Sequence, residues 1–106
     1  MPKNSFNLLS IVVCFVVFVL GEWAVYHKYV HLSYDDWDLA FFSQAFWSLC
    51  HSSQYASIVG INYLGDHSYY FSFLILPVFA LFQHPMTLLT LKVGAFAWSG
   101  YLLYRI

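Results

Sequence analysis

Charged side chains are scarce in this chain of 106 residues, which has four basic and five acidic residues. They make up 8% of the sequence, against roughly a quarter in soluble domains. There is no basic run and no acidic tail, so electrostatic binding to nucleic acid is excluded as a function. The two cysteines, Cys14 and Cys50, lack the spacing of a zinc knuckle or of a disulfide framework.

The sequence also lacks the signatures of several enzyme classes. It contains no glycine-rich phosphate loop, no nucleophile elbow, no zinc-protease helix motif and no N-glycosylation sequon. P-loop nucleotide hydrolysis, serine-dependent hydrolysis and zinc-dependent proteolysis therefore have no support in this chain.

The sequence is unusually rich in apolar residues. Hydrophobic residues make up 61% of the chain and aromatic residues 23%. A soluble chain of this length buries only about two-thirds of its surface on folding, which leaves too many apolar side chains in water. The composition therefore predicts an all-α integral membrane protein, in which the lipid bilayer or other helices cover these side chains.

Three apolar stretches, at residues 6–26, 68–83 and 86–106, predict about three transmembrane helices. The stretch at 68–83 is short for a membrane span and contains Pro77, which is expected to kink it. Only a short turn around residues 83–85 separates the last two stretches. We therefore expect these two helices to run antiparallel within a single membrane region.

The N-terminus resembles a secretory signal, because Lys3 precedes the first apolar stretch. Glu22 and Trp23 stand where a cleavage site needs small residues, so we expect an uncleaved signal anchor in the cell membrane. Lys3 favours a cytoplasmic N-terminus by the positive-inside rule, which places the segment 27–67 outside the cytoplasm. If the chain has three spans, this orientation places Arg105 outside the cytoplasm, which conflicts with the positive-inside rule.

The segment 27–67 is predicted to be an extracytoplasmic loop that contains an amphipathic helix at residues 36–51. Apolar side chains recur there at spacings of three and four residues, the pattern of a helix with one apolar face. Such a helix is expected to lie along the membrane surface. Its apolar stripe consists of Leu39, Phe42, Phe46 and Leu49.

Three carboxylates, Asp35, Asp36 and Asp38, lie within four positions soon after the first predicted span. At this spacing they can coordinate a hard divalent cation, or one of them can take a proton from an attacking hydroxyl. The structural alternative is that Asp35 or Asp36 caps the following helix and Asp38 faces its positive end. A helical projection places Asp38 on the apolar side, near Ala45, where a carboxylate needs a partner.

Two further groups of polar residues are candidate sites. Gly65, Asp66 and His67 precede the second predicted span, where Asp66 and His67 can contact a metal or a phosphate oxygen. An ordinary turn with a boundary histidine is the structural alternative. His27 and His31 have the spacing of a zinc or copper pair on one helix face, although histidines at the end of a span commonly bind no metal.

Lys92 lies inside the last predicted helix. An ammonium is costly there unless it reaches the membrane surface or faces a partner helix. The sequence favours neither of these two explanations.

A family resemblance runs through these motifs. Asp38-Leu39, Gln44-Ala45 and Trp47 resemble the opening motif Asp-Leu-Gly-x-Phe-Asp-Gln-Ala-Leu-Trp of domain-of-unknown-function family 2079, whose members are bacterial and archaeal membrane proteins. The likeness continues through the Gly-Asp-His motif at 65–67 and the segment 77–89.

The chain departs from the family pattern at three positions. Ser43 replaces an acidic residue, Ala40 replaces a glycine and Lys92 replaces a glutamine. These differences indicate an altered site or a divergent member.

The family is similar to the multi-spanning glycosyltransferases of the GT-C type, which use a polyprenyl-phosphate sugar as donor. In those enzymes an acidic residue in the first extracytoplasmic loop serves as base or metal contact. The resemblance implies that Asp38 and Asp36 are the catalytic residues. It also implies that Gln44, Asp66 and His67 bind substrate. The cofactor stays open, with a divalent metal cation as the candidate.

Enzymes of this type have many more than three spans. We therefore expect the chain to be the N-terminal part of a longer glycosyltransferase-like protein, inactive alone, that packs against further transmembrane helices. The alternative is a small structural or accessory membrane subunit with no catalytic activity, bound to a partner subunit. A metal-handling or transport fragment is a third hypothesis, based on the scattered histidines and the acidic loop.

Overall fold

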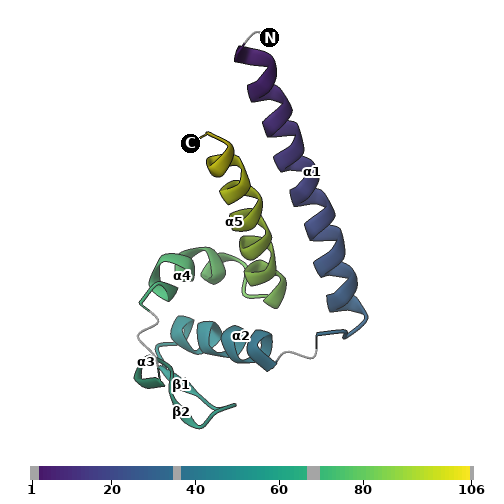
Figure 1. Ribbon diagram of the computed structural model, residues 1–106. Coiled ribbons are helices and arrows are strands. Elements are labelled where there is room, and N and C mark those ends of the chain that lie inside the picture. The colour runs from purple at the N-terminus through teal and green to yellow at the C-terminus, as the bar shows by residue number, and fades with distance from the viewer. Residues whose placement is uncertain (1–2, 35–36, 67–69, 106) are drawn as a thin grey trace. The chain divides into compact units, whose positions relative to one another are not determined.

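The computed structural model describes residues 3–34, 37–66 and 70–105 (Figure 1). Helices account for most of this part of the chain, which confirms the predicted all-α class. In chain order the elements are α1 (Lys3–Val30), α2 (Trp37–Cys50), β1 (Tyr55–Ala56), β2 (Ile61–Asn62), α3 (Tyr63–Asp66), α4 (Ser72–Leu81) and α5 (Pro85–Arg105).

The chain divides into two compact units. The first comprises Met1–Ser33 and Leu89–Ile106 and contains α1 and most of α5; we call it the helical pair. The second comprises Tyr34–Leu88 and contains α2, the β1–β2 hairpin, α3 and α4; we call it the connecting unit.

Among the described residues, two helices are long and apolar enough to cross a membrane. They are Leu8–Val30, within α1, and Pro85–Arg105, which is α5. At about 1.5 Å per residue each exceeds the hydrocarbon core of about 30 Å. Both helices lie where the apolar stretches 6–26 and 86–106 predict them.

Within the helical pair, α1 and α5 run antiparallel (Figure 1). The Thr90 hydroxyl donates a hydrogen bond to Glu22 Oε2 at 3.0 Å, and the Cys14 thiol donates one to the Ala97 carbonyl at 3.2 Å. From Glu22 to Cys14 the residue numbers fall along α1, while from their partners Thr90 to Ala97 they rise along α5, so the two helices run in opposite directions. The C-terminal end of α1 and the N-terminal end of α5 therefore lie at the same end of the pair.

Glycines allow these two helices to approach closely. A Cβ atom added to Gly21 would lie 2.7 Å from Val93 Cγ1, which is too close for real atoms. On the other helix, a Cβ added to Gly94 would make only an ordinary contact, 3.7 Å from the Phe18 ring, so Gly21 is the position where a side chain would not fit. Small residues at such contacts are typical of membrane helices, because they let the backbones come together.

α1 and α2 end in the same way without glycine. Leu32 and Ser52 have positive φ angles of 51° and 60°. After each, the next N–H bonds back to a carbonyl five residues earlier, Ser33 to Lys28 and Ser53 to Ser48, both at 2.9 Å. This is the Schellman motif, which satisfies the last carbonyls of a helix and turns the chain away from its axis.

The connecting unit has an apolar core of its own. The Phe41 and Tyr63 rings lie 5.8 Å apart, and the Phe46 and Phe79 rings 5.4 Å apart, so α2 packs on both α3 and α4. The apolar face predicted for residues 36–51 is therefore covered by other parts of the connecting unit. The core consists of Phe41, Ala45, Ala56 and Tyr63, with Phe42, Leu49, Val59 and Leu64 partly buried against it.

The hairpin is minimal and antiparallel. Tyr55 pairs with Asn62, and Ala56 pairs with Ile61. The Ala56 carbonyl accepts hydrogen bonds from the N–H groups of Val59 and Gly60, and Gly60 has a φ of 71°. Glycine takes this left-handed conformation without strain.

α4 differs from the second span predicted at 68–83. It has ten residues, Ser72–Leu81, and contains Pro77. At about 1.5 Å per residue it is about 15 Å long, half the thickness of the hydrocarbon core. α4 alone cannot cross a bilayer.

Candidate functional site

Asp38 lies in the first turn of α2, close after the end of α1. Its side chain is exposed, while Ala45, two turns further on the same face, is completely buried. The covered part of that face therefore ends before Asp38, so burial does not force the carboxylate to have a partner. The positive end of the α2 dipole stabilises a negative charge at this position.

The other acidic candidates are described only in part. Asp36 and His67 lie outside the described residues. Asp66 is the last residue of α3, so its backbone lies about one helical turn after that of Tyr63. The roles predicted for these three residues stay predictions.

Gln44 has a structural contact that the sequence does not reveal. Its side-chain nitrogen donates a hydrogen bond to the Ser57 hydroxyl. Its side-chain oxygen accepts one from the Ile58 N–H at 3.1 Å. Both ends of the amide thus hold the hairpin turn against α2, and substrate binding by Gln44 stays a prediction.

Ser43, which stands where the family pattern has an acidic residue, is also engaged locally. Its hydroxyl donates a hydrogen bond to the Leu39 carbonyl, four residues earlier in α2, at 2.6 Å. A serine inside a helix often bonds to its own backbone in this way.

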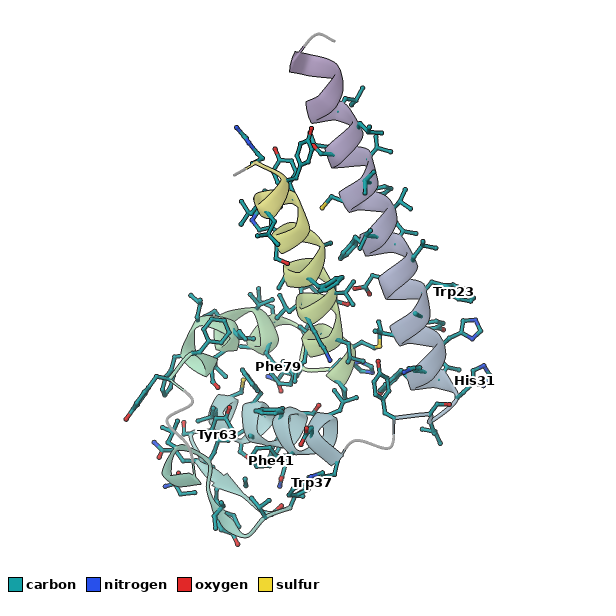
Figure 2. The ribbon with its side chains drawn as sticks, viewed as in Figure 1. Trp23, His31, Trp37, Phe41, Tyr63 and Phe79 are labelled. Carbon is teal, nitrogen blue, oxygen red and sulfur yellow. The ribbon has the colours of Figure 1, made fainter. Side chains whose placement is uncertain are left out.

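Tyr63 and Ser72 form a buried contact that sequence analysis missed. Tyr63 is 1% exposed and Ser72 5%, and their hydroxyl oxygens are 2.5 Å apart. Tyr63 points into the core beside Phe41 (Figure 2). The contact joins α3 to α4. A lone tyrosine in a loop gives no periodic signal that would predict this role.

Glu22 is a further residue whose role the sequence analysis missed; there it was used only as an argument against signal cleavage. It lies in the apolar part of α1, with one carboxylate oxygen bonded to Thr90. The other oxygen, Oε1, is buried without a hydrogen-bond partner among the described residues. A carboxylate within a membrane span is a functional candidate by default. The position of Glu22 within the first apolar stretch is the feature of the sequence from which this candidate could have been predicted.

The C-terminal end of α1 carries a row of rings. Trp23 and His27 have ring centroids 4.7 Å apart, and His27 and His31 have centroids 5.4 Å apart. Figure 2 shows Trp23 and His31 on the side of α1 that faces away from α5. Across the described ranges, no three His, Cys, Asp or Glu side chains gather into a possible metal site.

Lys92 is exposed on α5. This exposure is compatible with both explanations drawn from the sequence, since an exposed ammonium can reach the membrane surface or face a further helix.

A comparison with protein-family models identifies the chain. The model of the family described as "Predicted membrane protein (DUF2079)" matches residues 28–106. The chain belongs to this family. The match includes the connecting unit, α5 and all the motif positions that carry the resemblance, so the predicted family is confirmed. No curated protein and no solved structure matches the chain significantly.

Membership of a membrane-protein family agrees with the two membrane-length helices. This DUF2079 chain is therefore a membrane protein, and the site residues predicted from its sequence lie in the connecting unit.

Proposed function

We propose that this chain forms the first membrane region of a glycosyltransferase-like protein that uses a polyprenyl-phosphate sugar as donor. The observation that carries the proposal is the position of Asp38, an exposed carboxylate in the first turn of α2, close after a membrane-length helix. A base in such a place can meet a donor whose lipid tail lies in the bilayer and whose sugar lies outside it.

The chemistry assigned to Asp38 is proton removal. The acceptor hydroxyl oxygen forms a bond to the anomeric carbon while the bond from that carbon to the donor phosphate oxygen breaks. The hydroxyl proton passes to the Asp38 carboxylate, and polyprenyl phosphate leaves with the electron pair.

The phosphate that leaves needs a positive charge nearby. A divalent metal cation supplies this charge in many phosphoryl sites. Asp36, Asp66 and His67 are residues of this chain whose side-chain chemistry would fit such an ion, as would that of Asp35. The proposed proton transfer to Asp38 does not depend on it.

The proposal also requires the connecting unit to lie outside the cytoplasm. The antiparallel pairing of α1 and α5 is compatible with this orientation, because Lys3 and Arg105 then belong to the same end of the helical pair. Lys28 and Lys92 lie toward the opposite end, so the positive-inside rule does not by itself choose between the two ends. The conflict that Arg105 causes in a three-span arrangement does not arise.

The test uses the full polypeptide in membranes, incubated with synthetic polyprenyl-phosphate hexoses that carry a radioactive sugar. We expect transfer of the label from lipid to an acceptor, and we expect Asp38→Asn to lower it by a factor of about 100 or more. Tyr55→Phe, an exposed position in β1 that belongs to none of the motifs, is the control and should transfer normally. Extraction with carbonate checks membrane insertion of both variants.

Full transfer by Asp38→Asn would remove Asp38 from the mechanism. If the unaltered protein transfers sugar from none of the donors, the glycosyltransferase proposal itself is wrong.

A structural or accessory membrane subunit is the second candidate, and the surface of α1 favours it. Large exposed apolar side chains project from the sides of this helix that α5 does not cover, among them Leu9, Phe15 and Leu20. A photoreactive amino acid at Phe15 would distinguish the candidates. Stoichiometric cross-linking to a single membrane protein that also co-purifies supports the subunit, and cross-linking to lipid alone argues against it.

A further inference from the structure

α4 has two faces of different exposure. Toward the rest of the connecting unit it presents Ser72, which contacts Tyr63 of α3, and Phe79, which contacts Phe46 of α2; they are 5% and 2% exposed. On another side lies a continuous apolar stripe at spacings of three and four residues, which follows one helix face. This outer stripe consists of Phe71 at the N-cap, Leu74, Val78, Leu81 and Phe82, which are between 41% and 78% exposed.

The neighbourhood of the outer stripe has no charge. From Tyr70 to Leu91 the sequence contains no Asp, Glu, Lys or Arg residue. A helix face of this kind is unfavourable in water, and hydrocarbon with an aromatic-rich boundary is its natural surrounding. α2 differs in this respect, because other parts of the connecting unit cover its apolar face.

The chain itself determines which surface is within reach. Only Phe82, Gln83 and His84 separate α4 from α5, so its last residue lies within about 15 Å of the first residue of α5. α5 is long and apolar enough to cross the bilayer and begins at Pro85. α4 is therefore held close to the membrane surface at the point where α5 enters.

The direction of α5 decides whether α4 can cross. α1 and α5 are antiparallel, so the chain leaves the membrane after α1 and enters it again at α5 from the same side. The number of crossings between them must then be even. A single crossing by α4 would make α5 parallel to α1, and ten residues are too short for one.

We propose that the outer stripe of α4 docks on the lipid bilayer, with α4 lying in the interface on the side where α1 ends and α5 begins. The chain then crosses the membrane twice, and residues 31–84 stay on one side. This inference is independent of the glycosyltransferase proposal, because it depends on helix direction, helix length and exposed apolar side chains alone.

The first part of the test determines the sidedness of two loops. Ile58→Cys and Gln83→Cys, each exposed, are made separately in the full chain with both native cysteines replaced by alanine. A membrane-impermeant maleimide is then added to sealed vesicles of one orientation. We expect both positions to be labelled from the same side. Labelling from opposite sides would mean that α4 crosses and would overturn the proposal.

The second part measures depth. A bimane fluorophore on Leu74→Cys or on Leu81→Cys is reconstituted in phosphatidylcholine nanodiscs with lipids that carry a nitroxide at carbon 5 or at carbon 12 of the acyl chain. We expect both positions to be quenched at least twofold more by the shallow nitroxide than by the deep one. Ala80→Cys, exposed on a different face of α4, is the matched control and should be quenched less.

Two results would contradict this expectation. No quenching at Leu74→Cys and Leu81→Cys would mean that lipid does not cover the stripe, and the docking proposal would be wrong. Quenching of one position mainly by the shallow nitroxide and of the other mainly by the deep one would indicate an inserted α4, which also overturns it.

Discussion

The helical pair and the connecting unit are both rich in apolar residues, but different contacts hold them together. In the helical pair, α1 and α5 meet along a narrow seam that contains Gly21, Gly94 and Ala97, and most apolar side chains face outward. In the connecting unit, the rings of Tyr63 and Phe79 pack against α2, and the buried hydroxyls of Tyr63 and Ser72 bond to each other.

The difference shows what the surrounding medium does. In a bilayer, lipid tails are as apolar as leucine, so a helix pair needs only close packing and a few hydrogen bonds. Next to water, a unit must bury its own apolar side chains to be stable. Substitutions can test whether the two units follow these separate rules.

The largest effect is expected from Phe46→Ala in the connecting unit. Phe46 is 3% exposed and packs against Phe79. Loss of a buried phenylalanine costs about 3–5 kcal/mol of the free energy of unfolding. Hydrogen–deuterium exchange of the full chain in nanodiscs should show faster exchange throughout α2 and α4, while α1 is unchanged.

Trp47→Ala, at an exposed position on the same helix, is the control and should cost about 0.5 kcal/mol. If Phe46→Ala also made exchange in α1 faster, the two units would not fold separately.

Gly21→Leu should have the next largest effect, this time confined to the helical pair. The added side chain would collide with Val93, and overpacking of this kind costs about 1–3 kcal/mol. The measurement is disulfide formation between Cys14 and a cysteine introduced by Ala97→Cys, with Cys50→Ser as background. The yield should fall several-fold.

Gly100→Leu provides the comparison, because nothing lies within 4 Å of a Cβ added there. An equal loss of disulfide yield in both variants would show that the Gly21–Val93 contact is not what brings the helices together.

Tyr63→Phe tests the buried polar contact of the connecting unit. The ring still fills its place, but the Ser72 hydroxyl loses its partner, which costs about 1–3 kcal/mol. Exchange should rise at the start of α4, and adding Ser72→Ala should restore part of the protection. Tyr55→Phe, at an exposed tyrosine, should leave exchange as it is.

The smallest effect should come from the hydrogen bond between Glu22 and Thr90. Such bonds between membrane helices contribute about 0.6 kcal/mol on average. A double-mutant cycle with Glu22→Gln and Thr90→Val, followed by unfolding in sodium dodecyl sulfate, measures the coupling. A coupling above about 2 kcal/mol would exceed the range for such bonds and would mark Glu22 as more than a packing contact.

Much of the fold could be predicted from the sequence. Long apolar runs locate α1 and α5, and the recurrence of Leu39, Phe42 and Phe46 locates α2, because these signals are local along the chain. The apolar run at 68–83 was harder to interpret. Hydropathy records that a segment is apolar, but it does not distinguish a helix that crosses the bilayer from one that lies on its surface.

The candidate site was predicted only in part. The sequence placed Asp38 at the start of a helix after the first span, and the structure has it there. The contacts of Gln44 with Ser57 and Ile58, and of Tyr63 with Ser72, join residues far apart in the sequence and leave no periodic trace. Sequence patterns alone could not reveal them.

The sequence by itself thus determined that this is a helical membrane protein of the DUF2079 family, with a carboxylate close after its first membrane helix. Composition and periodicity are enough for the helical membrane class, because each is a property of neighbouring residues, and the motifs at 38–47, 65–67 and 77–89 carry the family resemblance. Only the tertiary structure decided that α1 and α5 are antiparallel and that Glu22 meets Thr90. Helix direction depends on which side chains meet across the fold, and no single segment contains that information.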